Sequence, residues 1–275
     1  MNYILYNPNA GSCTARLEDA AAHLSGETTR VDITDISSYT TFLSSLTEDD
    51  TLMILGGDGT LNRFINETEG LTLPENLLYF PAGSGNDFAH EMDVTDRPIS
   101  IREQIKDLPK VTVKGKTYRV LNGVGYGIDG YCCQVGDELR KDSSKKVDYT
   151  AIAIKGLLFH YKPTNATVTV DGVEKTYRKV WLAPTMNGKY YGGGMIPTPD
   201  QKRNSGVLSV MLFHGSGKLH TLMIFPSIFK GEHVKQKKHV EVLSGKEITV
   251  TFDRPSPLQI DGETILDVTS YTITV

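Results

Sequence analysis

The feature that most constrains the fold is an apolar run that ends in a cluster of glycines, TLMILGGDGTLN at residues 51–62. Residues 52–55 have the continuous apolarity of a strand buried on both faces, and residues 61–67 have helical spacing. A glycine turn between such a strand and a helix exposes backbone N–H groups and the positive end of the helix dipole, so a phosphate can approach it. Glycine and aspartate also dominate ordinary tight turns, so the motif alone leaves both interpretations open.

Two further apolar segments end in loops of small residues. Residues 3–6 run into NPNAGS at 7–12, and residues 77–80 run into PAGSGNDFA at 81–89. Parallel strands that alternate with helices end at one edge of their sheet, so the loops together predict a site for the phosphates of a nucleotide. Asp58 would either ligate Mg²⁺ there or accept loop N–H groups, and the sequence does not choose between these roles. The predicted phosphate-binding residues are Asn7, Ser12, Gly56, Gly57, Gly59, Thr60, Asn62 and Ser84.

Composition limits the range of functions. A net charge of -4 with 23% charged residues argues against nucleic acid as a partner, because its binders usually carry a basic excess. The 3 cysteines fit neither a disulfide framework nor a zinc site. The chain begins with a strand pattern rather than a signal peptide, and no apolar run reaches the roughly 18–20 residues that span a bilayer. We therefore expect a cytoplasmic protein whose only contact with a membrane would be peripheral, at the inner membrane surface. The basic clusters at 140–146 and 235–239 are typical of a solvated face, and they would attract anionic headgroups if the substrate is a lipid.

Two patterns divide the chain. Up to about residue 110, predicted strands alternate with predicted helices, which indicates a parallel sheet covered by helices. Beyond that point, period-two segments rich in β-branched residues indicate mainly antiparallel strands, interrupted by helical patterns at 149–161 and 219–229. We predict an α/β nucleotide-binding domain at residues 1–112 and a mainly antiparallel β domain at 113–275.

The chain resembles the diacylglycerol kinase catalytic domain family, and within it the soluble bacterial lipid kinases related to sphingosine kinases. The resemblance rests on the three loops above, on NGKYYGGGM at 187–195 and on the Asp261-Gly262-Glu263 motif. It implies an α/β domain followed by a β-sandwich, with the active site in the cleft between them. It also implies ATP and Mg²⁺ as cofactors and a lipid substrate at the membrane surface, and it leaves a homodimer open. NAD kinases share the GGDGT loop, but the segment at 81–89 is similar to the lipid kinases.

The resemblance also implies roles for individual residues. Family members place the general base at the Asp-Gly-Glu motif, so Asp261 is the predicted base, and Glu263 is predicted to position it or to share the proton transfer. An aspartate before glycine is also typical of a turn, and Asn-Asp before an apolar segment is typical of a helix N-cap. The expected substrate-binding residues are Gly85, Asn86, Asp87 and Asp129.

Two departures from the family pattern bear on activity. Arg63 stands where the family often has glutamate, and RNSG at 203–206 replaces an acidic Asp-Gly pair that tends to hold a structural Mg²⁺ in bacterial members. Because a hard cation prefers carboxylate oxygens, we predict no structural metal at 203–206. The favoured hypothesis is an ATP-dependent lipid kinase that converts diacylglycerol to phosphatidic acid. The alternatives are a kinase of a soluble hydroxyl compound such as NAD, and a catalytically impaired protein that binds nucleotide or lipid.

Overall fold

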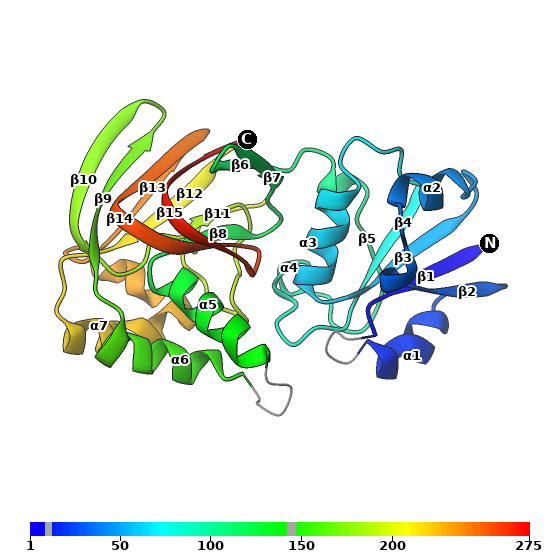
Figure 1. Ribbon diagram of the computed structural model, residues 1–275, viewed down its shortest axis with the longest axis horizontal. Coiled ribbons are helices and arrows are strands. Elements are labelled where there is room, and N and C mark those ends of the chain that lie inside the picture. The colour runs from blue at the N-terminus through cyan, green and yellow to red at the C-terminus, as the bar shows by residue number, and fades with distance from the viewer. Residues whose placement is uncertain (9–12, 142–146) are drawn as a thin grey trace. The chain divides into compact units, whose positions relative to one another are not determined.

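The computed structural model describes residues 1–8, 13–141 and 147–275, which form two compact units, Met1–Leu108 and Pro109–Val275 (Figure 1). The boundary lies four residues before the predicted one at residue 112. The reason is strand β6 (Lys110–Val113), whose residues pair with strand β15 (Glu263–Thr274) of the C-terminal unit.

The N-terminal unit is built on a five-stranded sheet in the order β2-β1-β3-β4-β5. The first four strands run parallel, and the short β5 is antiparallel to β4. Leu52 to Leu55 are fully buried in the central strand β3, as their continuous apolarity predicts. The strands are β1 (Asn2–Tyr6), β2 (Thr28–Asp32), β3 (Thr51–Gly56), β4 (Asn76–Pro81) and β5 (Ile99–Ser100).

Short helices follow these strands, which confirms the predicted alternation. The helix expected from Leu61 begins earlier, at Asp58, so that half of the glycine motif belongs to its first turn. The helices are α1 (Leu17–Ala21), α2 (Tyr39–Ser44), α3 (Asp58–Glu67) and α4 (Asp87–Glu91), with 3-10 turns at Thr14–Arg16, Ile33–Asp35 and Glu103–Ile105.

The C-terminal unit is antiparallel, as predicted. Its main strand order is β13-β12-β11-β8-β14-β15-β6-β7, and β9 joins both β10 and the first half of β14. Besides β6 and β15, the strands are β7 (Lys116–Arg119), β8 (Gly123–Tyr126), β9 (Thr164–Val170), β10 (Val173–Val180), β11 (Thr185–Met186), β12 (Leu208–Phe213), β13 (Val240–Gly245) and β14 (Glu247–Ile260).

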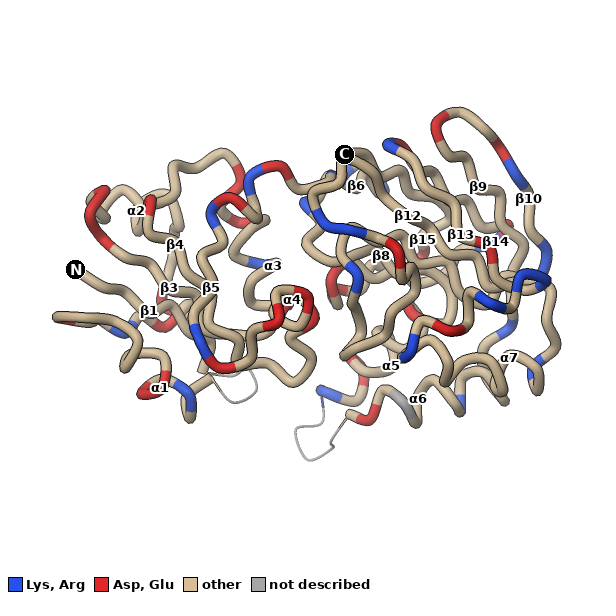
Figure 2. Tube along the Cα trace, turned by 180° about the vertical axis from the view of Figure 1, so that it is seen from behind, with Lys and Arg blue, Asp and Glu red and all other residues tan. Residues whose placement is uncertain are grey.

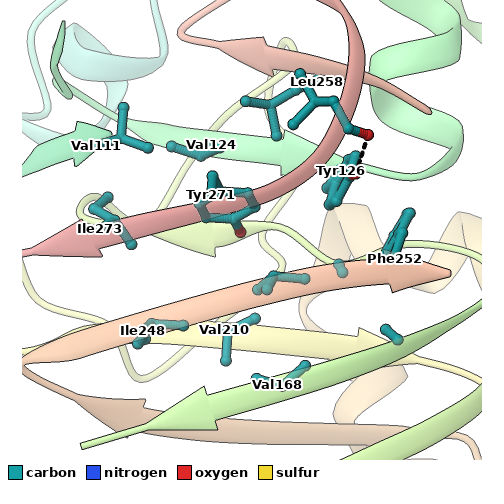
Figure 3. Close-up of a cluster of buried hydrophobic side chains, with 14 of the residues drawn as sticks. Val111, Val124, Tyr126, Val168, Val210, Ile248, Phe252, Leu258, Tyr271 and Ile273 are labelled. Atoms are coloured by element: carbon teal, nitrogen blue, oxygen red, sulfur yellow. Dashed lines mark hydrogen bonds between the residues drawn. The ribbon is translucent and has the colours of Figure 1, made fainter. Parts of the chain in front are cut away.

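The long strand β14 serves both layers of this unit. Its first half pairs with β9, its last residues pair with β8, and its register against β15 shifts between Thr251 and Leu258. Side chains from the layers meet in one apolar core, where the rings of Tyr126 and Phe252 stack with centroids 3.7 Å apart (Figure 3). Tyr126 remains satisfied there because its hydroxyl donates to the carbonyl of Val268.

Helices cover one side of the C-terminal unit (Figure 1). The helical patterns at 149–161 and 219–229 form α-helices, the first of which continues into a π-helical turn and the second into a 3-10 helix. No helix was expected at 128–140, because glycines at 130 and 136 weaken its pattern. The helices are α5 (Ile128–Arg140), α6 (Tyr149–Lys155), π-helical η4 (Gly156–His160), α7 (Lys218–Ile224), and 3-10 helices η5 (Phe225–Lys230) and η6 (Glu232–Lys235).

The glycines of α5 have a packing role, which a substitution can test. A Cβ on Gly130 would lie 1.9 Å from the carbonyl oxygen of Pro257 on β14, so we expect Gly130→Ala to lower the free energy of unfolding by roughly 1–3 kcal/mol. Gly136→Ala is the matched control, since its Cβ would meet only the movable ring of Tyr149. Denaturant titration compares the two variants. Equal stabilities would contradict the close approach of α5 to β14.

Candidate functional site

Two of the predicted phosphate loops touch each other at their glycines. A Cβ on Gly83 would lie 2.5 Å from the Cα of Gly57, and one on Gly57 would lie 3.0 Å from the Cα of Gly83. Ala82 N also donates to the carbonyl of Gly56, which continues the pairing of β3 and β4 into the loops. The loops therefore form one surface because neither contact residue has a side chain.

Asp58 joins the same two loops through its carboxylate. Its Oδ2 accepts the N–H of Asp87 at 2.9 Å, and its Oδ1 accepts the N–H of Phe88 at 3.0 Å. These N–H groups belong to the first turn of α4, where a carboxylate is favoured by the helix end. The structure shows Asp58 in the second of the two roles that the sequence left open, as an acceptor of loop N–H groups.

Asn86 closes the second loop rather than capping the helix. It has a left-handed backbone with φ of 51°, and its side chain makes no capping bond to α4. The amide instead bonds Gly83 in both directions, at 2.8 Å from N to Oδ1 and at 2.8 Å from Nδ2 to O. Asp87, which follows, is buried at the start of α4. The N-cap position was predicted, but the cap itself comes from Asp58.

The other predicted residues of this unit lie around the same edge of the sheet. Gly59 and Ser84 are exposed, Thr60 is on the first turn of α3, and Asn62 is buried one turn later. Asn7 follows β1, Gly85 lies in the loop before α4, and Ser12 is outside the described residues. Arg63, the first departure from the family pattern, lies 2.7 Å from Glu67 one helical turn away.

The C-terminal unit contributes a second group of predicted residues, centred on Asp261. Asp261 and Gly262 both have positive φ, 48° and 96°, and form the two-residue turn between β14 and β15 that Asp-Gly favours. The Asp261 carboxylate accepts three backbone N–H groups, from Leu121 at 2.6 Å, Asn122 at 2.7 Å and Gly123 at 2.9 Å. Asp261 therefore fixes the segment before β8, a role that the turn interpretation allowed.

A buried polar pair supports the same turn from the other side. Gln259 accepts the N–H of Gly262 at 2.7 Å and donates to Oδ2 of Asp129 at 2.9 Å. Asp129 is buried at the start of α5, and this burial raises the pKa of its carboxyl to about 6, while the hydrogen bond from Gln259 acts in the opposite direction. The structure thus brings Asp129 and Asp261 into one network through a residue that the sequence analysis missed.

Arg203 binds oxygen atoms of the segment before β8. Its guanidinium donates to the carbonyl of Leu121 and, at 2.8 Å, to Oδ1 of Asn122. The backbone N–H groups of Asn187 and Gly188 donate to the carbonyl of Asn122 at 2.9 and 3.0 Å. The Asp261 carboxylate therefore binds the N–H groups of this segment, and the Arg203 guanidinium binds its oxygens.

Glu263 differs from Asp261 in its surroundings. It is exposed, and its carboxylate makes no hydrogen bond or ion pair to any residue that the structure describes. The next residue, Thr264, donates to Oδ2 of Asp137 on α5 at 2.7 Å, which anchors the start of β15. Glu263 thus projects from a strand end that is held on both sides.

Some residues of this network carried a signal in the sequence. Gln259 is a polar residue inside the apolar run Leu258-Gln259-Ile260, and Asn122 stands between Leu121 and a strand. A buried polar side chain in an apolar strand needs partners, so its position indicates a network. Arg203 was described in the sequence analysis only as part of a segment that lacks the family's acidic pair. Its bonds to Leu121 and Asn122 could not be predicted, because these partners are more than 80 residues away in the chain.

Comparisons with known proteins match both units of the chain. Residues 122–273 match the YegS C-terminal NAD kinase beta sandwich-like domain, and residues 2–116 match the diacylglycerol kinase catalytic domain. A protein of Staphylococcus aureus (strain Newman) named "Putative lipid kinase" is 29% identical over 274 residues, 95% of this chain and 87% of that protein. The crystal structure of a diacylglycerol kinase from Bacillus anthracis (strain Sterne) has the same fold, with a TM-score of 0.64 and 18% identity over 99% of this chain and 92% of that one.

An α/β unit with glycine loops at a helix start, joined to an antiparallel β unit, is the architecture of a two-domain kinase. The chain belongs to the diacylglycerol kinase catalytic domain family, in the branch that carries the YegS-type C-terminal domain. This confirms the resemblance drawn from the motifs. None of the helices in the described part of the chain is long and apolar enough to cross a membrane.

The buried carboxyl of Asp129 gives stability a pH dependence. Its pKa rises from 3.8 to about 6 on folding, so between these values the folded protein holds a proton that the unfolded chain has lost. The free energy of unfolding should therefore fall as pH rises through this window and level off above it. We expect Asp129→Asn to remove this decline and to be more stable than the parent at pH 8 by about 1–3 kcal/mol.

Denaturant titrations at pH 4, 6 and 8 measure this effect. Glu138→Gln, which changes an exposed carboxylate on the same helix, is the control and should keep the parent's pH profile. A parent profile retained by Asp129→Asn would show that another group produces it.

Proposed function

We propose that the protein is an ATP-dependent lipid kinase that transfers the γ-phosphoryl group to the hydroxyl of diacylglycerol and forms phosphatidic acid. Family membership supports a kinase. The observation that carries the proposal is the contact between Gly57 and Gly83, which gives a side-chain-free surface at the start of α3. Backbone N–H groups and the helix dipole favour phosphate at such a surface.

The phosphates of ATP would bind the first turn of α3, where Gly59 is exposed and a Cβ would meet nothing within 4 Å. Mg²⁺ usually binds one or two carboxylates together with substrate phosphates. Asp58 and Asp87 are carboxylates in the first turns of α3 and α4, and a hydrogen bond joins the two residues, so they fit this cofactor. Mg²⁺ would offset the negative charge of the phosphates.

For the general base we favour Glu263 over Asp261. A carboxylate that accepts three N–H groups is stabilised as an anion and is a weak proton acceptor. Glu263 is exposed two residues further on and carries no such bonds to the described residues. Asp261 would then position the strand end from which Glu263 acts on the lipid hydroxyl, with Asp129 supporting the same turn.

Two other functions remain as alternatives. Phosphorylation of a soluble hydroxyl compound such as NAD would use the same phosphate loops, but the match to the diacylglycerol kinase catalytic domain over residues 2–116 favours a lipid. A protein without catalysis would be favoured by a disrupted loop at Arg63. Arg63 instead pairs with Glu67, which leaves the glycine loop intact. We also propose that the protein works peripherally at the inner membrane surface, where diacylglycerol is found.

Transfer of radiolabel from ATP into diacylglycerol tests the function and its base together. We expect labelled phosphatidic acid with the parent protein and a fall in kcat of about 10²–10⁴-fold for Glu263→Gln, the usual contribution of a positioned base. KM for ATP should change little in this variant. Labelling of NAD but not of lipid would replace the lipid proposal by its first alternative.

Asp261→Asn is the comparison that separates positioning from catalysis. The asparagine has one oxygen in place of two, so its NH₂ would face a backbone N–H and loosen the segment at 121–123. Hydrogen exchange of these amides should become faster in Asp261→Asn and stay unchanged in Glu263→Gln. Full kcat in Glu263→Gln with a collapse in an otherwise ordered Asp261→Asn would return the base to Asp261.

Gly59 allows a test of the phosphate surface without harm to the fold. Gly59→Ala adds a methyl group in open space on a helix, where alanine is favoured over glycine by up to about 1 kcal/mol. We therefore expect equal or higher thermal stability but at least about tenfold weaker ATP binding, because the methyl group lies where phosphate approaches. Gly57→Ala is the control that should lose stability as well, since its Cβ would press on Gly83. Parent-like ATP affinity in Gly59→Ala, measured by calorimetry, would remove this turn from the site.

A further inference from the structure

The C-terminal unit exposes large apolar side chains on its helical side. Phe159 on η4 is 72% exposed, and Leu219 and Met223 on α7 are 74% and 72% exposed. The opposite faces of the same elements are buried, with Leu157 and Ile224 in the apolar cluster beneath the helices. These elements therefore have an inner face that the fold uses and an outer apolar face that it does not use.

The three exposed side chains belong to one surface. Leu219 and Met223 are four residues apart on α7 and so share a face of the helix. Lys218, at the start of α7, donates to the carbonyl of Leu158 at 2.9 Å, which places α7 beside η4 and Phe159. We call Phe159, Leu219 and Met223 the η4–α7 patch. Ile154 and Phe229, each 43% exposed, lie on the neighbouring α6 and η5.

The chain around the patch is basic, although the protein as a whole has a net charge of -4. Segments 149–163 and 216–240 contain one acidic residue, Glu232, which pairs with Lys235 at 2.9 Å. His220 of α7 packs on His239 with ring centroids 4.9 Å apart, so the basic run that precedes His239 lies next to α7. Figure 2 shows segments of Lys and Arg, both in blue, on this side of the unit. The lysines, all exposed, are Lys155, Lys162, Lys218, Lys230, Lys235, Lys237 and Lys238.

We propose that the η4–α7 patch is the surface by which the protein docks on an anionic phospholipid bilayer. Apolar side chains among lysines match a bilayer interface, where the former enter the boundary of the acyl chains and the latter bind lipid phosphates. Lysine is depleted in protein–protein interfaces, which argues against a protein partner. A symmetric dimer through this face would oppose the lysines of two copies. The proposal rests on the lipid kinase function, since it states how the enzyme reaches a substrate that lies in a membrane.

Vesicle binding tests the proposal directly. The variant Phe159→Ser/Leu219→Ser/Met223→Ser should bind vesicles of phosphatidylcholine and phosphatidylglycerol at least tenfold more weakly than the parent in cosedimentation. The parent should bind vesicles of pure phosphatidylcholine weakly, and Lys155→Gln/Lys230→Gln should lower its binding to the mixed vesicles. Val173→Ser is the matched control, because Val173 is 73% exposed in the same unit but lies on β10, and it should bind as the parent does. Circular dichroism confirms that each variant is folded.

A second measurement separates this proposal from the proposed function. Kinase activity of the triple variant should fall on diacylglycerol in anionic vesicles and stay at the parent level on a short-chain, water-soluble diacylglycerol. If no lipid is phosphorylated by any variant but vesicle binding still depends on the patch, the docking surface stands and the kinase proposal fails. Parent-like vesicle binding by the triple variant overturns the docking surface. A parent dimer that becomes monomeric in that variant, with vesicle binding unchanged, would instead assign the patch to contact between two copies.

Discussion

The contact between Gly57 and Gly83 is the constraint on which the N-terminal site depends. With no side chain on either residue, the ends of β3 and β4 stay in contact beyond their last paired residues, Gly56 and Pro81. Asp58 can then reach the first turn of α4, and α3 and α4 begin at one place. A Cβ at either position would separate the loops by a few tenths of an ångström or more, and the carboxylate would lose its bonds to Asp87 and Phe88. Gly57 and Gly83 therefore matter first because they let the two loops pack together. Any effect on a bound ligand follows from that packing.

Both aspartates of the glycine motifs use their carboxylates in the same way. Asp58 accepts two N–H groups of α4, and Asp261 accepts three N–H groups of the segment before β8. Hydrogen bonds to an ionised group contribute about 1.5–3 kcal/mol each, so these carboxylates hold their loops as strongly as an apolar contact would. Another carboxylate lies close to each of them. Asp87 is on the neighbouring loop and donates its N–H to Asp58, and Glu263 follows Asp261 by two residues. At the second motif, a division into a positioning acid and a reacting acid would explain why the two carboxylates occur together.

The sequence predicted those elements whose pattern depends on their own residues. Its predictions were weaker for elements that depend on contacts with residues far away in the chain. Continuous apolarity identified β3, and period-two alternation identified the antiparallel unit, because each pattern reflects burial of that segment alone. Helix α5 was missed because Gly130 and Gly136 weaken its helical pattern. These glycines are needed because α5 packs closely against Pro257 and Tyr149, which are more than ten residues away in the chain. The hydrogen bonds that Asp261 accepts had no local signal for the same reason, because the N–H groups come from residues 121–123, about 140 positions earlier. The predicted role of Asp261 as the general base came from the family resemblance and not from a local pattern.

Arg203 shows how one substitution in a motif can change what holds a loop. The carbonyl of Leu121 and the amide oxygen of Asn122 are the kind of neutral oxygens that a cation coordinates, and the guanidinium of Arg203 donates to both. A guanidinium repels a second positive charge beside it, so the prediction that 203–206 holds no structural metal now has a second reason besides the missing carboxylates. The guanidinium also lies across the same peptide groups from the Asp261 carboxylate, so the two opposite charges polarise this segment in one direction. The turn that carries Glu263 is therefore held by charges within the chain itself, and its order should depend less on divalent cations than that of a relative with the acidic pair.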